Sequence, residues 1–351
     1  MPSATTAVVP VPTSASAQGR WIADAVGQSP AFVTSSLPIA TEDLVWIAIG
    51  AFVFALGLQW VGQIAYARFT AAGAWAVFGL FWLDMVPYFY GEVQSPLETL
   101  LSLAAVPLCL YTGYLLAQGR DSLLVLSKAV AFMGLIYLPV ETIPIVQTWL
   151  IETTAAQANV GMELLGYSPD LVEGENGYLS KLYFPPEETV TGRSTYIILA
   201  CTGIGSMAIF GGLIASVRAP LGRKLAALAA SIGIIWFLNL LRNVFIGLAS
   251  PWGWFQFEPV ISITTALMGV PEDQVSFIVA HHFIAQTLAI LALLGITYLV
   301  VRVLPEILEP LEEALFVLTG TEYDLFEAVG REDVRADGGP EETATANRAD
   351  D

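Results

Sequence analysis

The chain has 351 residues, of which 55% are hydrophobic and only 13% are charged, and its mean hydropathy is +0.66. A soluble protein of this length is far less apolar, so the composition predicts a polytopic membrane protein. The formal net charge of −18 excludes nucleic acid as a partner, because phosphate binding needs a basic surface. Acidic loops and tails also favour a protein adapted to high salt, where such surfaces stay hydrated.

The polar N-terminal segment, residues 1–43, lacks the charged start and short apolar core of a cleaved secretory signal. The first long apolar run begins near Leu44, which indicates an uncleaved anchor. Residues 304–351 form an acidic tail that is poor in apolar residues from about Gly320 onward. We therefore expect the end of this tail to be disordered.

Seven segments are long and apolar enough to cross a hydrocarbon core of about 30 Å, which takes about 20 helical residues. The predicted spans are Leu44–Ala67, Ala71–Tyr90, Leu97–Gln118, Ser122–Thr142, Tyr196–Val217, Lys224–Ala249 and Phe277–Val303. The first four form an N-terminal group at residues 44–142, and the last three form a second group at residues 196–303. The predicted fold class is therefore all-α, a polytopic bundle of about seven transmembrane helices.

Basic residues occur at the cytoplasmic ends expected for alternate crossings. They are Arg68, Arg120, Arg218, Arg223, Lys224 and Arg302. The intervening connections are acidic, and the ones after the second and sixth spans contain no basic residue. Short basic loops face the cytoplasm, so this alternation predicts an outer N-terminus and an inner C-terminus.

The longest connection, residues 143–195, is an acidic loop with several aromatic residues among its turn residues. On the predicted orientation it lies outside the cell. It either packs over the outer mouth of the bundle as a cap or forms a solvated linker.

Three polar side chains are predicted at one depth near the outer face. With a rise of 1.5 Å per residue, Cys201 lies about 8 Å below the outer boundary in the fifth span. Arg242 lies about 11 Å below it in the sixth span, and His281 and His282 lie about 6–8 Å below it in the seventh. A thiol, a guanidinium and an imidazole therefore converge in three consecutive spans.

Each of these groups also has an ordinary structural explanation. A membrane cysteine packs as a small hydrophobe, an arginine near the boundary extends to the interface, and a histidine bridges two helices. However, ionisable groups inside a membrane are costly and usually mark functional sites. The coincidence of three such groups favours a catalytic interpretation.

In that interpretation Cys201 is a nucleophile that forms a thioester, because a neighbouring cation favours the reactive thiolate. Arg242 never loses its charge and stabilises the thiolate or a developing oxyanion. His281 or His282 donates a proton to the departing amine. The two histidines are about 100° apart around an α-helix, so at most one faces the sulfur.

Smaller neighbours support this site. Thr202, Gly203 and Gly205 leave space for a substrate backbone beside the sulfur. Asn239 shares a helical face with Arg242, and it either orients the guanidinium or makes an ordinary interhelical hydrogen bond.

The other cysteine, Cys109, is predicted about 18 Å below the outer boundary, about 10 Å deeper than Cys201. That separation excludes a disulfide, so Cys109 is expected to serve packing only. No spacing of Cys and His residues in the sequence forms a metal site, and no cofactor is expected.

At these residues the sequence resembles the exosortase/archaeosortase family. The resemblance rests on "ACTG" around Cys201, "NLLRN" around Arg242 and a histidine at the start of the final span. The motifs cover roughly residues 196–303, whereas the N-terminal half matches only as a set of apolar spans. The order Cys, Arg, His, with one residue in each successive span, carries the specificity.

The resemblance implies a membrane-embedded cysteine transpeptidase. Its partners would be secreted proteins ending in a Pro-Gly-Phe-type motif, an apolar helix and a basic tail, with S-layer glycoprotein as the major substrate. The new C-terminus would pass to a membrane lipid, at a site near the extracellular face of the cell membrane. By this resemblance Cys201 is the nucleophile, Arg242 the transition-state stabiliser, and His281 or His282 the proton donor, with His281 preferred.

Two other functions remain as alternatives. A polytopic transporter or channel would also explain seven spans with buried charges, although the sequence has no internal repeat and no paired broken helices. An intramembrane cysteine protease would use the same residues and differ only in resolving the thioester with water.

Overall fold

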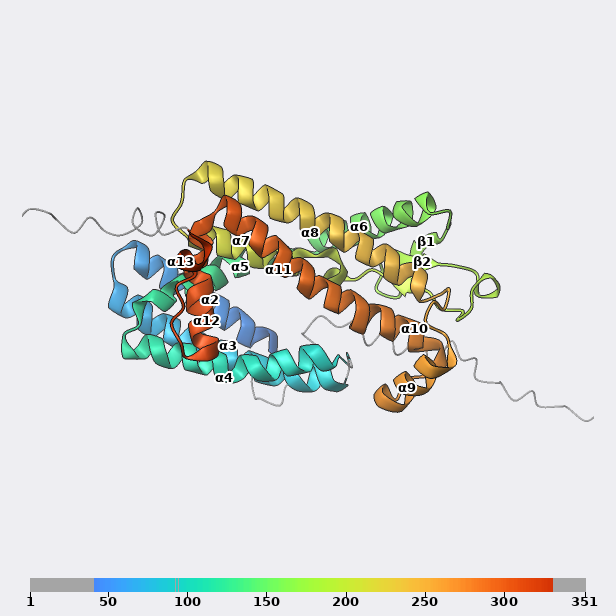
Figure 1. Cartoon of the computed structure of the whole chain (residues 1–351), viewed down its shortest axis with the longest axis horizontal. Helices are drawn as coiled ribbons and strands as arrows, with labels where there is room; N and C mark the ends of the chain where they lie inside the picture. Colours follow the sequence, from blue (N-terminus) through green and yellow to red (C-terminus); the bar gives the residue numbers. More distant parts are fainter. Residues whose placement is uncertain (1–40, 92, 94, 331–351) are drawn as a thin grey trace, which may run out of the picture.

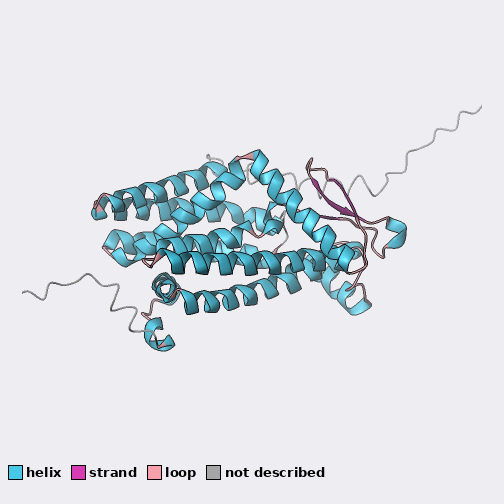
Figure 2. Cartoon of the chain, turned by 90° about the horizontal axis from the view of Figure 1, so that it is seen from above, coloured by secondary structure: helices cyan, strands magenta, loops and turns pink. Residues whose placement is uncertain are grey.

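The computed structural model describes residues 41–330, apart from residues 92 and 94. Within this range the chain is a bundle of helices with a small sheet at one end (Figures 1 and 2). Six of the described helical segments are long and apolar enough to cross a membrane. The prediction of a polytopic helical membrane bundle is confirmed. Disorder was predicted from about Gly320, and this is wrong for Leu325–Val329, which form a short helix with Phe326 buried. The rest of that stretch, after residue 330, and the predicted polar segment before residue 41 lie outside the described residues.

The N-terminal half is a group of four long helices. They are α2 (Thr41–Trp60), α3 (Ile64–Gly91), α4 (Pro96–Gln118) and α5 (Leu124–Thr142), with the 3-10 turn η2 (Asp121–Leu123) before α5. Phe52 packs edge-on against Trp75 and Phe78, and the Trp75 Nε1 donates a hydrogen bond to Ser127 Oγ at 3.0 Å. These contacts tie α2 and α5 to α3, so the half is a packed unit.

The first predicted span was too long at its C-terminal end. The prediction of one helix through Ala67 is wrong, because α2 ends at Trp60 and α3 begins at Ile64. Gly62 has a φ of 77°, a left-handed conformation that favours glycine and allows the tight turn. The hydropathy of the sequence does not indicate this turn, because the residues on both sides of it are equally hydrophobic.

The connection at residues 143–195 is more ordered than a loop. It begins with helix α6 (Pro144–Leu164), which carries Pro144 at its first position as many helices do. An antiparallel three-stranded sheet follows, with the order β1 (Asp170–Glu173), β2 (Leu179–Tyr183), β3 (Thr195–Tyr196) and the 3-10 turn η3 (Pro186–Glu188) before β3. Ala155, Ala158 and Met162 of α6 are buried in one cluster with Leu182 of β2. This segment therefore packs on the bundle instead of forming a solvated linker.

The C-terminal half contains the remaining elements. They are η4 (Leu199–Thr202), α7 (Ile204–Ser216), α8 (Leu221–Ala249), α9 (Glu258–Met268), η5 (Glu272–Gln274), α10 (Val275–Ile278), η6 (Val279–Ala285), α11 (Gln286–Val303), η7 (Pro305–Ile307), α12 (Leu308–Thr319) and α13 (Leu325–Val329). The segment η6 is π-helical and continues without a break between α10 and α11.

The fifth predicted span is wrong. Residues 195–196 belong to a strand, residues 199–202 form a 3-10 turn, and the helix α7 has only 13 residues. Gly203 has a φ of 80°, which ends the turn before α7 begins. Cys201 therefore lies on a short turn just before the N-terminus of α7, and α7 is only about half as long as the predicted span.

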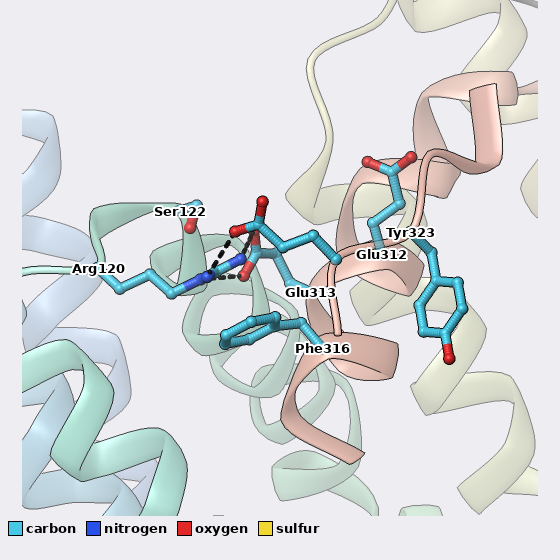
Figure 3. Close-up of a pocket in the computed structure, with 7 residues that line it drawn as sticks. Arg120, Ser122, Glu312, Glu313, Phe316 and Tyr323 are labelled. Carbon is cyan, nitrogen blue, oxygen red and sulfur yellow. Dashed lines mark hydrogen bonds and ion pairs between the residues drawn. The ribbon is translucent and has the colours of Figure 1, made fainter. Parts of the chain in front are cut away.

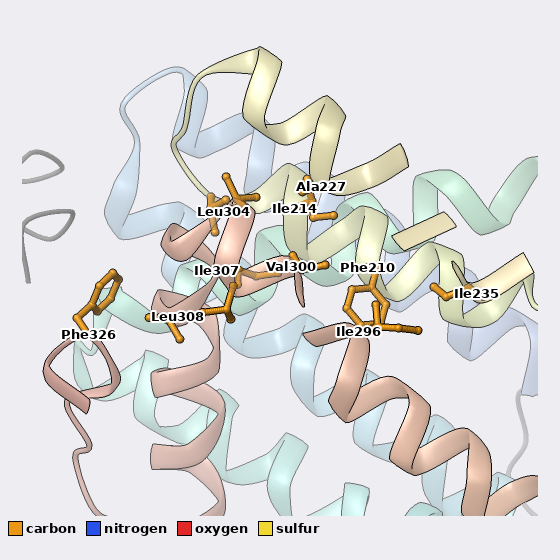
Figure 4. Packing of buried hydrophobic residues seen from close by; sticks show 12 residues of the cluster. Phe210, Ile214, Ala227, Ile235, Ile296, Val300, Leu304, Ile307, Leu308 and Phe326 are labelled. Carbon is orange, nitrogen blue, oxygen red and sulfur yellow. The ribbon is translucent and has the colours of Figure 1, made fainter. Parts of the chain in front are cut away.

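A shared apolar core joins the helices of the C-terminal half. Figure 4 shows Phe210 and Ile214 of α7 facing Ile235 of α8 and Ile296 of α11. The cluster continues through η7 into α12 and α13. The two halves meet where α7 packs against α5, and a Cβ on Gly212 would lie only 2.4 Å from the Ala129 carbonyl oxygen. Close approach of the two backbones depends on this glycine.

The predicted basic connections lie at the end of the bundle opposite the sheet, together with α12 and α13 (Figure 1). The tail was predicted as unstructured only from about Gly320, and α12 before that point packs across α4 and α5. Arg120 pairs with Glu313 of α12 at 3.0 Å (Figure 3), and Arg223 pairs with Glu306 at 2.5 Å. These ion pairs fasten the C-terminal helices to the loops at this end.

Candidate active site

Cys201 lies in the turn η4, where the chain passes from the sheet into α7. Its backbone N–H donates to the Ile198 carbonyl at 2.8 Å, and the Thr202 hydroxyl donates to the Leu199 carbonyl at 2.7 Å. The turn is therefore held by its own polar groups. Cys201 is half-buried and free of any disulfide, and it packs against the apolar cluster that α6, β2 and α8 share.

Two asparagines of α8 hold the backbone of Cys201. Asn239 Nδ2 donates to the Cys201 carbonyl oxygen at 2.6 Å, and Asn243 Nδ2 donates to the same oxygen at 2.8 Å. The two residues are four apart, so they project from one face of the helix. These two hydrogen bonds to the same carbonyl oxygen fix Cys201 beside the turn of α8 that carries Arg242.

Arg242 contacts the next span. Its Nη2 lies 3.1 Å from His281 Nε2, and His281 belongs to the π-helical segment η6. A π-helical turn is wider than an α-helical turn and is often found at functional sites. Arg242 and His281 were predicted at the same depth from helical rise alone, and the structure brings them into direct contact.

This contact determines which ring nitrogen of His281 carries a proton. The guanidinium has only donors, so His281 Nε2 must accept from it. In the neutral ring Nδ1 then bears the hydrogen. This Nδ1 is buried and has no hydrogen-bond partner among the described side chains. It is therefore a buried donor available to a bound molecule.

His282 is the second histidine of the pair. Its ring lies 4.6 Å from the His281 ring in an edge-on arrangement, and Phe277 stacks on His281 at 5.1 Å between ring centres. Within the described residues, Arg242 donates a hydrogen bond to His281 and not to His282. His282 Nδ1 is likewise buried without a hydrogen-bond partner among the described residues, so the choice of His281 as the proton donor stays a prediction.

A cavity of about 370 Å³ adjoins these groups. Gly203, Asn239 and Arg242 line one part of it, and apolar side chains of α8 and α11 line the rest. The cavity therefore has a polar end next to the Cys201 turn and an apolar body along α11. An apolar chain with one polar reacting group fits this distribution.

The structure shows the contacts of the supporting residues and of the second cysteine. Thr202 is buried and its hydroxyl bonds within the turn. A Cβ on Gly203 would lie 3.2 Å from Asn239 Cγ. The missing side chain therefore lets the turn pack closely on α8, in addition to any space that it leaves for a substrate. Asn239 donates to the Cys201 carbonyl, so its contact matches the second of its two predicted roles, a hydrogen bond to the neighbouring segment. Cys109 is buried in α4 against Gly79 of α3, as a packing residue would be.

The chain is similar to known membrane proteins over most of its length. Residues 40–258 match the family model described as transmembrane exosortase. Archaeosortase A of Haloferax volcanii is 42% identical over 309 residues, which cover 83% of this chain and 98% of that relative. Archaeosortase A of Natronomonas pharaonis is 42% identical over 285 residues, which cover 79% of this chain and 89% of that relative. The chain belongs to the exosortase/archaeosortase family.

The family membership confirms the resemblance that the motifs around Cys201 and Arg242 predicted. It also agrees with the finding of a multi-pass membrane protein. Cys201 and Arg242 lie within the residues matched to the exosortase model, and His281 lies after them. No solved structure matches the chain.

Sequence reasoning missed several polar residues around this exosortase-like site. Asn243, the last residue of the "NLLRN" motif, was given no role, although its spacing of four from Asn239 indicates a shared face. Glu98 of α4 and Gln286 of α11 were not considered, and they hydrogen-bond to each other at 3.4 Å. Polar residues in apolar spans were the available signal for both.

Proposed function

We propose that this protein is a membrane-embedded cysteine transpeptidase that cleaves a C-terminal Pro-Gly-Phe-type sorting signal of secreted proteins. The new C-terminus passes to a membrane lipid, and S-layer glycoprotein is the expected major substrate. The active site faces the extracellular side. The observation that carries the proposal is the contact between Arg242 and His281, on the helix whose asparagines hold Cys201.

The first half-reaction forms a thioester. The Cys201 sulfur attacks the scissile carbonyl carbon, and Arg242 stabilises the negative charge that develops on the oxygen. As the C–N bond breaks, His281 Nδ1 gives its proton to the departing amine. The proton lost by the thiol restores the neutral imidazole, so the first step is balanced.

In the second half-reaction a nucleophilic group of the lipid attacks the thioester carbonyl. The C–S bond breaks, the lipid becomes joined to the protein, and the nucleophile's proton returns to the thiol. The apolar body of the cavity along α11 supports an apolar acceptor or an apolar substrate segment next to the polar groups.

The decisive experiment is replacement of Cys201 by alanine in the full-length protein in its membrane. Full-length substrate is expected to accumulate, whereas Cys109→Ala, which removes the packing cysteine, leaves processing intact. Normal processing by the Cys201→Ala variant would exclude the cysteine mechanism and favour a transporter or channel.

The mass of the processed substrate's C-terminal peptide separates transfer from hydrolysis. A lipid adduct is the expected result. A free carboxylate would identify an intramembrane protease that uses the same residues and resolves the thioester with water.

A further inference from the structure

We infer that the cavity between α7, α8 and α11 holds one hydrocarbon chain of the acceptor lipid, with the lipid headgroup beside Arg242. The inference rests on the proposed function, which requires a lipid acceptor but assigns it no place in the molecule. It makes Ala289 and Ala292 of α11 residues that bind the acceptor. The apolar helix of the substrate then lies elsewhere on the bundle.

Helices α8 and α11 form the long walls of the cavity. They run side by side in opposite directions (Figure 1). On the α11 side, Ala285, Ala289 and Ala292 all line the cavity and recur at spacings of four and three, so they share one face. Small side chains on this face leave room beside α8 that larger residues would fill.

The cavity is polar at one end and apolar at the other. Asn239 and Arg242 line it beside the Cys201 turn. Ile235 lines the opposite end, about 10 Å from Arg242 along α8 at a rise of 1.5 Å per residue. Ile235 and Ile296 are both buried in the core cluster that Figure 4 shows, so the cavity stops at the packed core.

The width of the cavity excludes a helix as its occupant. The lining residues of α11 extend from Ala285 to Ile296, which is about 16 Å of helix. A volume of about 370 Å³ spread over that length gives a mean width of about 5 Å. An α-helix with its side chains is about 10–12 Å wide. A hydrocarbon chain is one carbon wide, and its contacts at about 4 Å fill this space.

The length and the polar end of the cavity lead to the same occupant. About 16 Å is roughly half of the 30 Å hydrocarbon core, so a membrane-spanning segment exceeds the cavity in length as well as in width. The polar end suits a headgroup, because Arg242 is a permanent cation that hydrogen-bonds to phosphate and carboxylate groups.

The cavity also borders the surface that faces the membrane. Leu241 of α8 and Leu288 of α11 line it, yet they are 50% and 57% exposed. Exposed apolar residues of a spanning helix face lipid, because lipid tails are as apolar as leucine. A lipid chain therefore reaches the cavity sideways between these leucines, without crossing water.

Occupancy is measured with the full-length protein in nanodiscs of phosphatidylglycerol, a small share of which carries a photoreactive diazirine near the end of one chain. After irradiation, mass spectrometry should find the label on Ile235 or Ile296, which are buried and out of reach of lipid on the outer surface. Ala289→Phe fills the cavity and should reduce this labelling by about tenfold or more, because each buried methylene group is worth a factor of about four in binding.

Ala230→Phe is the matched control. It makes the same change at an exposed position of α8 that does not line the cavity, so labelling should stay at the wild-type level. Label confined to exposed residues such as Leu241, or equal labelling of the buried isoleucines in Ala289→Phe and wild type, would overturn the inference. If Ala289→Phe does not fold, Ala289→Leu takes its place, and unchanged labelling in that variant overturns the inference as well.

The two half-reactions separate a lipid from a substrate helix in the cavity. In a single turnover, Ala289→Phe should release the substrate's C-terminal helix at nearly the wild-type rate, whereas formation of the lipid adduct falls by about tenfold or more, in line with the lost binding. The processed protein should then be recovered as the thioester or as a free carboxylate. A loss of release as large as the loss of transfer would place the substrate helix in the cavity and reject the inference.

Cys201→Ala is measured in parallel to keep the two proposals apart. Processing that continues without Cys201 would reject the proposed function, whatever the labelling shows. Lipid transfer that depends on Cys201 but stays at the wild-type rate in Ala289→Phe would reject only the lipid site.

Discussion

Arg242 of α8 and His281 of η6 lie 3.1 Å apart between Nη2 and Nε2. Because the arginine can only donate, the contact fixes the histidine tautomer and leaves Nδ1 protonated. An ordinary interhelical hydrogen bond would need neither a permanent cation nor a π-helical turn. Next to the turn that holds Cys201, Arg242 therefore supplies a permanent charge and His281 supplies a proton from a π-helical segment.

The two histidines are expected to differ sharply in importance. His281→Ala removes the contact with Arg242 and should lower the processing rate by about 100-fold or more, the usual range for loss of a general acid. His282→Ala keeps that contact and should retain most of the wild-type rate. The measurement is the rate of substrate processing in membranes that contain equal amounts of each variant. A larger defect in His282→Ala would transfer the proton-donor role to His282.

The sequence predicted the parts of the site that lie on continuous helices. Arg242 and His281 are on α8 and on the α10–η6–α11 segment, so counting residues from the membrane boundary brought them to one level. The counting assumed a helix around Cys201, and that assumption is wrong, because strand β3 and turn η4 set the position of this residue. Its position next to α8 depends on hydrogen bonds from Asn239 and Asn243.

Other features could not be predicted because they depend on tertiary contacts. The helix α6 buries alanines against α8, and its mixed composition was interpreted as part of an acidic loop. The π-helical turn has no residue pattern that separates it from an α-helix. Glu98 and Gln286 meet only when the two halves of the molecule are assembled.

The two asparagines that hold Cys201 are expected to act together. Each hydrogen bond contributes about 1 kcal/mol, so Asn239→Ala or Asn243→Ala should slow processing by about fivefold. The double variant leaves the Cys201 carbonyl without either donor and should lose more than the product of the single effects. Gln157→Ala removes the Trp236 hydrogen bond elsewhere on α8 and serves as the control with an unchanged rate. Single effects that simply multiply would show that the two bonds are independent.

Gly203 and Gly205 provide a matched pair for the backbone of the turn. Gly203→Ala adds a Cβ 3.2 Å from Asn239 Cγ and puts alanine at a φ of 80°, which costs about 1–2 kcal/mol. We expect lower thermal stability and a strong loss of processing, because the turn must move away from α8. A Cβ at Gly205 meets nothing within 4 Å, so Gly205→Ala should be tolerated. Thermal unfolding and processing rates of the two variants in nanodiscs test this, and equal behaviour would contradict it.

Arg120 is expected to stabilise the molecule without contributing to the reaction. Its guanidinium lies 3.5 Å above the Phe316 ring and pairs with Glu313, whose side chain is only 12% exposed. Arg120→Ala should lower the free energy of unfolding by about 1–2 kcal/mol, because it removes the ring contact and leaves the largely buried Glu313 without its partner. Glu322 also pairs with Arg120 but is 77% exposed, so Glu322→Gln should have almost no effect.

The effect of Arg120→Ala should persist at high salt, because partly buried pairs and ring contacts are screened less than exposed charges. Processing should continue at the wild-type rate in membranes at a temperature where both proteins are folded, since Arg120 lies at the end of the bundle opposite the sheet (Figure 1). Thermal unfolding of the three proteins at low and high salt measures the stability difference. A processing defect in folded Arg120→Ala would instead link this cluster to the active site through α8 or α11.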